Sequence, residues 1–157
     1  VGWDEILEGG LAPGAIVMSW RGEAGGIEAA QHGHDVVMTP GAYTYFDRYQ
    51  SADKENEPLA IGGCTPIEKV CEYNPVPAGL SEQQAKHVLG SQFQLWTEYM
   101  PTPKDVERMM LPRAFALSEV LWSPNGVANT NEFMDRLPHA LRLLDRAGIN
   151  YRPLDRK

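Results

Sequence analysis

The chain has 157 residues, of which 43% are hydrophobic and 22% charged, a composition typical of a folded domain rather than of a disordered segment. Its formal net charge of −7 argues against a nucleic-acid binder, because such proteins usually present a basic surface. No apolar run approaches the roughly 20 residues that a transmembrane helix needs, so no membrane partner is expected. The chain begins at Val1 rather than at a methionine, which favours a processed product or a piece of a longer chain.

The first part of the chain alternates between strand-like and helix-like segments. Residues 1–3, 15–20 and 35–38 are short apolar runs of strand length, and residues 25–33 between the last two carry apolar side chains at helical spacing. A fourth strand is expected at about 90–96. Continuous apolar strands separated by helices predict a parallel sheet with helices on one side.

The segment 41–63 differs from its surroundings. Aromatic residues come first and a polar run follows, so we expect a long loop, which in a compact domain is usually functional. A short helix at 67–73 and a loop at 74–81 follow it.

The last third of the chain is predicted to be helical. Thr102 is a typical N-cap, and Pro112 should break the first helix before it continues over 113–122. The tryptophan at the end of that segment, Trp122, is expected to pack its helix against the rest of the fold. A final helix is predicted at about 129–147.

Neither the cysteines nor the histidines indicate a metal site or a cofactor. Cys64 and Cys71 are most simply two unpaired thiols, since one sparse pair does not make a disulfide framework. His32 and His34 lie where a helix should end and a strand begin, so a turn is the better interpretation. No spacing joins the histidines to the cysteines as zinc ligands.

Tryptophans and carboxylates gather near the predicted strand ends, which is where a parallel α/β barrel carries its active site. Converging tryptophans with carboxylates at the rim suit a sugar, which has apolar C–H faces and hydroxyl donors. The simpler alternative is that these aromatic side chains only fill the core. The side chains concerned are Trp3, Asp4, Glu5, Trp20, Tyr45, Asp47, Trp96 and Glu98.

These segments resemble, in order, those of family 20 glycoside hydrolases, the β-N-acetylhexosaminidases. The segments are Gly-Trp-Asp-Glu at 2–5, Val-Met-Ser-Trp-Arg-Gly at 17–22, Tyr-Phe-Asp at 45–47, Gly-Ser-Gln-Phe-Gln-Leu-Trp-Thr-Glu at 90–98, Pro-Arg-Ala-Phe-Ala at 112–116 and Glu-Val-Leu-Trp at 119–122. The resemblance implies an α/β fold of the (β/α)8 TIM-barrel family. Such a barrel typically needs about 250 residues. Residues 1–157 would then be the C-terminal portion of one catalytic domain, a half barrel of roughly strands 5–8 with their helices.

The resemblance also implies substrate-assisted catalysis, in which the acetamido oxygen of the sugar attacks its own anomeric carbon. Tyr45 would position that acetamido group. The Asp-Glu pair that supplies the acid in this family would lie upstream of Val1. Asp4 and Glu5 do not replace it, because they lack the His-x-Gly-x context of the acid pair, and we expect them to make structural hydrogen bonds instead.

The substrate-binding residues implied by the resemblance fall into two sets. Trp3, Trp20 and Trp96 would enclose the N-acetyl group and stack on the sugar ring. Asp47 and Glu98 would accept hydrogen bonds from the O4 and O6 hydroxyls. Arg113 and Glu119, in the same matched segments, are expected to form a helix ion pair or other scaffold contacts.

The sequence therefore predicts a fragment of an exo-β-N-acetylhexosaminidase that removes terminal GlcNAc or GalNAc from glycans. The alternative is a non-catalytic half barrel that acts as a sugar-binding or assembly module. Copies of a half barrel could associate through the face that the other strands would normally cover. By analogy with the bacterial members of the family, a periplasmic or secreted location is expected.

Overall fold

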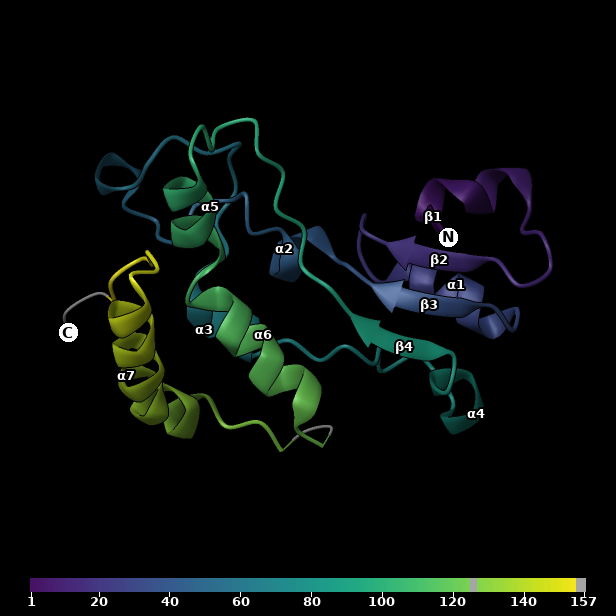
Figure 1. Ribbon diagram of the computed structural model, residues 1–157. Helices are drawn as coiled ribbons and strands as arrows, with labels where there is room; N and C mark the ends of the chain where they lie inside the picture. The colour runs from purple at the N-terminus through teal and green to yellow at the C-terminus, as the bar shows by residue number, and fades with distance from the viewer. Residues whose placement is uncertain (125–126, 155–157) are drawn as a thin grey trace. The chain divides into compact units, whose positions relative to one another are not determined.

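The structure is a computed structural model that describes residues 1–124 and 127–154 (Figure 1). The chain divides into two compact units. The first, which we call the sheet unit, comprises Val1–Tyr45 and Asn74–Phe93, and the second, the helical unit, comprises Phe46–Tyr73 and Gln94–Lys157. No helix among the described residues is long and apolar enough to cross a membrane.

The sheet unit contains a parallel sheet of four strands, as the sequence predicts, in the order β1-β2-β3-β4 (Figure 1). Because all neighbouring strands pair in parallel, their carboxyl ends lie at the same edge of the sheet. Buried residues alternate with half-buried ones along β2 and β3, and Val17, Val36 and Met38 are fully buried. The strands are β1 (Gly2–Trp3), β2 (Ile16–Ser19), β3 (Asp35–Met38) and β4 (Val88–Ser91).

Helix α1 (Ala24–Gln31) covers β2 and β3 through small side chains. Gly26, Ala29 and Ala30 are buried in this contact, and the Gly26 amide donates a hydrogen bond of 2.9 Å to Ser19 Oγ. The predicted turn at the histidines follows α1 directly. Three further elements complete the unit, namely the 3-10 helix η1 (Asp4–Gly9) and the short helices α2 (Gly41–Thr44) and α4 (Glu82–Ala85).

Two predictions for this region were inaccurate. The last strand ends at Ser91, and residues 92–98 follow it outside the sheet. Gly90 has φ of 140°, which side-chain-bearing residues rarely adopt, and the pairing with β3 is irregular between Val36 and Val37, so β4 is less regular than its apolar pattern suggests. The segment expected to be a long loop, 41–63, contains α2 and the 3-10 helix η2 (Lys54–Asn56).

The helical unit follows the predicted helix boundaries closely. The Thr102 hydroxyl accepts from the Asp105 amide while the Asp105 carboxylate accepts from the Thr102 amide, a capping box that begins α5. Gly148 ends α7 in the left-handed conformation. Pro112 separates α5 from α6, as predicted. The helices are α3 (Ile67–Cys71), α5 (Pro103–Met110), α6 (Arg113–Trp122) and α7 (Thr130–Ala147).

The expectation for Trp122 was wrong. Its side chain is 91% exposed at the last residue of α6, so it does not pack the helix against the fold. The helix is held instead by buried residues on its other face, among them Ala116, Leu117 and Val120.

Candidate active site

The sheet unit carries three of the predicted site residues where its strands end. Trp3 is the last residue of β1, Trp20 directly follows β2, and Tyr45 follows the short helix α2 after β3. The rings of Trp20 and Tyr45 stack, with centroids 6.1 Å apart and an interplanar angle of 29°. The unit thus places an indole and a phenol side by side at this edge of the sheet.

Asp4 and Glu5 hold Trp20 in place. Both carboxylate oxygens of Glu5 accept hydrogen bonds from the Trp20 indole, at 3.0 and 3.1 Å. Asp4 is almost fully buried and accepts from the backbone amides of Trp20 and Arg21, while its other oxygen pairs with Arg21 Nε at 2.8 Å. These are the structural hydrogen bonds expected of the pair. A backbone hydrogen bond at Glu5, followed by the Trp20 indole, lowers the pKa of Glu5, so this carboxyl is poorly suited to donate a proton.

The helical unit carries the other predicted site residues. Asp47 is 5% exposed, and its Oδ1 has no hydrogen-bond partner among the described residues. Burial raises the pKa of Asp47, and the nearby charge of Glu98 raises it further. Trp96 is 45% exposed and Glu98 is exposed. A buried acceptor with an unused lone pair can bind a hydroxyl donor strongly.

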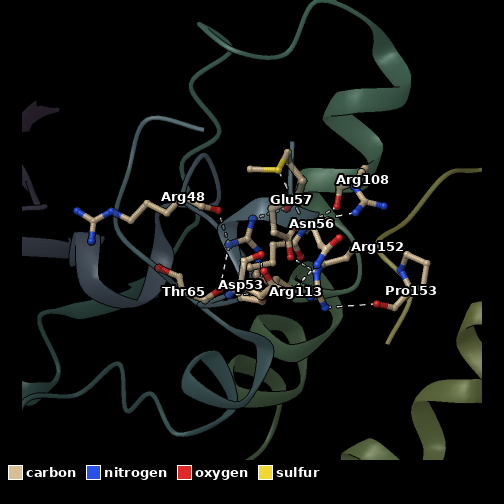
Figure 2. A network of polar contacts seen from close by, with 12 residues as sticks. Arg48, Asp53, Asn56, Glu57, Thr65, Arg108, Arg113, Arg152 and Pro153 are labelled. Atoms are coloured by element: carbon tan, nitrogen blue, oxygen red, sulfur yellow. Dashed lines mark hydrogen bonds and ion pairs between the residues drawn. The ribbon is translucent and has the colours of Figure 1, made fainter. Parts of the chain in front are cut away.

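Arg113 lies at the centre of a polar network in the helical unit, shown in Figure 2. It is fully buried and donates to backbone carbonyl oxygens on three segments, those of Phe46 and Arg48, of Thr65, and of Met109. The sequence prediction of a scaffold contact is therefore correct, but the ion-pair alternative is not.

The partner of Glu119 is Arg136 of α7, at 2.6 Å.

No signal in the sequence distinguishes Arg113 from a surface arginine, because the partners of Arg113 are carbonyl groups that every residue possesses.

A cluster of ion pairs lies beside this network (Figure 2). The Glu57 side chain is only 3% exposed and pairs with Arg152 at 2.6 Å and with Arg108 at 3.8 Å. These contacts tie the polar segment after Asp47 to α5 and to the end of the chain. Among the residues that the structure describes, no group of three His, Cys, Asp or Glu side chains is arranged to hold a metal ion.

Barrel enzymes carry their active sites beyond the carboxyl ends of the parallel strands, which is where the sheet unit carries its tryptophans and the carboxylates beside them. The family model of glycosyl hydrolase family 20, catalytic domain, matches residues 1–125. The chain belongs to this family.

Curated relatives carry hexosaminidase names. A beta-hexosaminidase of Porphyromonas gingivalis is 50% identical over 152 residues, covering 96% of this chain and 19% of the relative. A beta-N-acetylhexosaminidase of Cellulomonas fimi is 30% identical over 155 residues, covering 96% of this chain and 31% of the relative. The chain thus spans between about a fifth and a third of the length of these relatives.

Solved structures of the family share the fold. A GH20 exo beta-N-acetylglucosaminidase of Vibrio harveyi, in complex with N-acetylglucosamine, aligns with a TM-score of 0.85 at 30% identity, over 97% of this chain and 24% of that one. An N-acetyl-beta-hexosaminidase of Streptomyces plicatus aligns with a TM-score of 0.83 at 26% identity, over 96% and 31%. The fold class is therefore α/β of the TIM-barrel family, to which this chain contributes a four-stranded parallel sheet.

Proposed function

We propose that the protein is a β-N-acetylhexosaminidase, which hydrolyses terminal GlcNAc or GalNAc from glycans, and that this chain receives the terminal sugar. Membership of glycosyl hydrolase family 20 is the observation that carries the proposal. The names of the relatives and the N-acetylglucosamine bound by the Vibrio harveyi enzyme support the substrate class. In this proposal residues 1–157 supply strands 5–8 of the barrel, as the C-terminal part of one catalytic domain.

The proposed reaction proceeds in two steps with retention of configuration. The acetamido oxygen of the substrate forms a bond to the anomeric carbon while the glycosidic C–O bond breaks, and a carboxylic acid upstream of Val1 protonates the leaving oxygen. Water then attacks the anomeric carbon of the oxazolinium intermediate, giving its proton to the same carboxylate. The acetamido group is re-formed, so the substrate supplies its own nucleophile.

The residues of this chain bind and orient the sugar. Tyr45 donates its hydroxyl hydrogen to the acetamido oxygen and aims it at the anomeric carbon, which is a proximity effect. Trp3, Trp20 and Trp96 enclose the acetamido methyl group and the ring face. The Trp20–Tyr45 stack and the two hydrogen bonds that the Trp20 indole donates to Glu5 support this role, since they hold an aromatic wall in a defined orientation.

Asp47 and Glu98 accept hydrogen bonds from the O4 and O6 hydroxyls at the non-reducing end. The unpaired, buried Oδ1 of Asp47 supports this assignment, because a hydroxyl donor would satisfy it.

The test uses the full-length protein and an aryl N-acetyl-β-glucosaminide. Release of the aryl group, inhibited by a stable thiazoline mimic of the oxazolinium, is the expected result. Binding of GlcNAc without hydrolysis would favour a sugar-binding module instead.

A further inference from the structure

The backbone on both sides of Asp47 is held by one side chain. Arg113 Nη2 donates to the Phe46 carbonyl at 2.6 Å, and Arg113 Nη1 donates to the Arg48 carbonyl at 3.1 Å. The Phe46 amide in turn donates to the Gln94 carbonyl at 2.8 Å. The residues immediately before and after Asp47 therefore both have backbone groups with fixed partners within the helical unit.

Arg113 is itself held rigidly. Its remaining contacts on the same two nitrogens are the Met109 carbonyl at 2.6 Å and the Thr65 carbonyl at 3.0 Å. The Phe46 ring lies under the guanidinium, with Cζ 4.7 Å from the ring centroid. The planar fork of arginine can satisfy several carbonyls at once, whereas the ammonium of lysine is a point charge on a flexible stem.

Burying the Arg113 guanidinium costs desolvation free energy that an apolar side chain at the same place would not cost. Burial lowers the pKa of Arg113 to about 9, and its side chain is shielded completely from solvent. A buried charge contributes little net stability compared with a well-packed apolar side chain of similar size. An arginine at this place is more readily explained by the geometry that it imposes.

We propose that Arg113 is a positioning residue that sets the orientation of Asp47 toward the hydroxyls at the non-reducing end of the sugar. The inference rests on the proposed function, which assigns those hydroxyls to Asp47. Arg113 touches no substrate. It holds the carbonyl groups of the residues immediately before and after Asp47, and so limits where the backbone of Asp47 and its carboxylate oxygens lie.

The test compares the full-length enzyme with the variants Arg113→Lys, Arg113→Gln and Asp47→Asn. The readout is kcat/KM for an aryl N-acetyl-β-glucosaminide divided by kcat/KM for its 4-deoxy and 6-deoxy analogues. Because both rates scale with the amount of folded enzyme, this ratio does not change when a variant merely folds less well. A hydrogen bond to a charged acceptor predicts a wild-type ratio of about 10 to 100 for at least one analogue.

Asp47→Asn should reduce this ratio to within about threefold of unity. Arg113→Gln should reduce the ratio to a similar value. Arg113→Lys keeps the charge and some of the carbonyl contacts, so its ratio should lie between those of Arg113→Gln and the wild type. The matched control is Leu117→Ala, one helical turn further along α6, where a buried side chain is truncated. It should lower stability and leave the ratio unchanged.

The outcomes separate the inference from the proposed function. If Asp47→Asn collapses the ratio while both Arg113 variants keep the wild-type value, the role of Asp47 stands and Arg113 is only structural. If Asp47→Asn leaves the ratio unchanged, both assignments are wrong. If neither Arg113 variant folds, even at low temperature, Arg113 acts on the fold as a whole and the inference is overturned.

Discussion

At the scale of single residues, the candidate site combines side chains held by hydrogen bonds with one buried carboxylate that has an oxygen without a hydrogen-bond partner among the described residues. Trp20 is fixed through its indole by Glu5 and by stacking on Tyr45. Asp47 is buried, and one of its oxygens lacks a partner among the described residues. Such an arrangement lowers stability in the absence of ligand, which is a common feature of binding sites.

We predict that Asp47→Asn is at least as stable as the wild type at neutral pH. Burial raises the pKa of Asp47 above its value in the unfolded chain, so between these two pKa values the folded state binds more protons than the unfolded state. The stability that the protonated group contributes is therefore present at low pH and is lost as the pH rises through the folded pKa. Urea unfolding between pH 3.5 and 8 measures this effect.

The difference in free energy of unfolding, variant minus wild type, should grow with pH. Asp135→Asn, an exposed position on α7, is the control and should show no such trend. A variant that is destabilised more at pH 8 than at pH 4 would contradict the burial argument.

We predict that Tyr45→Phe lowers turnover more than binding. Its hydroxyl is proposed to act on the acetamido oxygen during attack, so the loss should appear mainly in kcat, by about 100-fold, as for other single donors that stabilise developing charge. The control is Tyr43→Phe on α2, which should keep kcat close to the wild type. Steady-state kinetics of the full-length enzyme provide the measurement. A wild-type kcat for Tyr45→Phe would remove Tyr45 from the proposed mechanism.

At the scale of elements, helix α1 can approach the sheet closely because it carries glycine where it crosses β3. A Cβ added to Gly26 would lie 2.5 Å from Met38 Sδ and 3.2 Å from Ser19 Cβ. Met38 is fully buried in β3, so its side chain has little room to move.

We predict that Gly26→Ala destabilises the fold by about 1–3 kcal/mol through overpacking, despite the better helix propensity of alanine. Adding Met38→Val should recover part of this loss, because valine ends before the position of Sδ. Gly9→Ala is the control, since a Cβ there meets nothing within 4 Å. Chemical denaturation of the wild type, Gly26→Ala, Gly26→Ala with Met38→Val, and Gly9→Ala measures these differences in the free energy of unfolding. Equal stability of Gly26→Ala and the wild type would show that the helix can shift.

At the scale of the whole molecule, the four-stranded sheet is open, with β1 and β4 at its edges. The chain covers 19% to 31% of the relatives from Porphyromonas gingivalis and Cellulomonas fimi. A barrel needs further strands to close, and the proposed mechanism assigns the acid to a residue upstream of Val1.

We predict that a polypeptide of these 157 residues alone does not detectably hydrolyse an aryl N-acetyl-β-glucosaminide. The loss of a general acid alone typically costs about 10²- to 10⁴-fold in rate, and missing sugar contacts add to this. The full-length protein, assayed in parallel, is the positive control. Activity within tenfold of that control, abolished by Asp4→Asn or Glu5→Gln, would mean that these two residues are the acid pair after all.

The sequence by itself determined the elements that depend on local chemistry. The strand Asp35–Met38, the Thr102 cap and the helix end at Gly148 follow from apolar runs, side-chain caps and backbone preferences, all of which act within a few residues. The order of the motifs also indicated the family. Only the tertiary structure decided the end of β4 at Ser91, the exposure of Trp122 and the role of Arg113. Each of these depends on contacts between residues far apart in the chain, above all the hydrogen bonds from Arg113 to backbone carbonyls, which leave no signature in any local pattern.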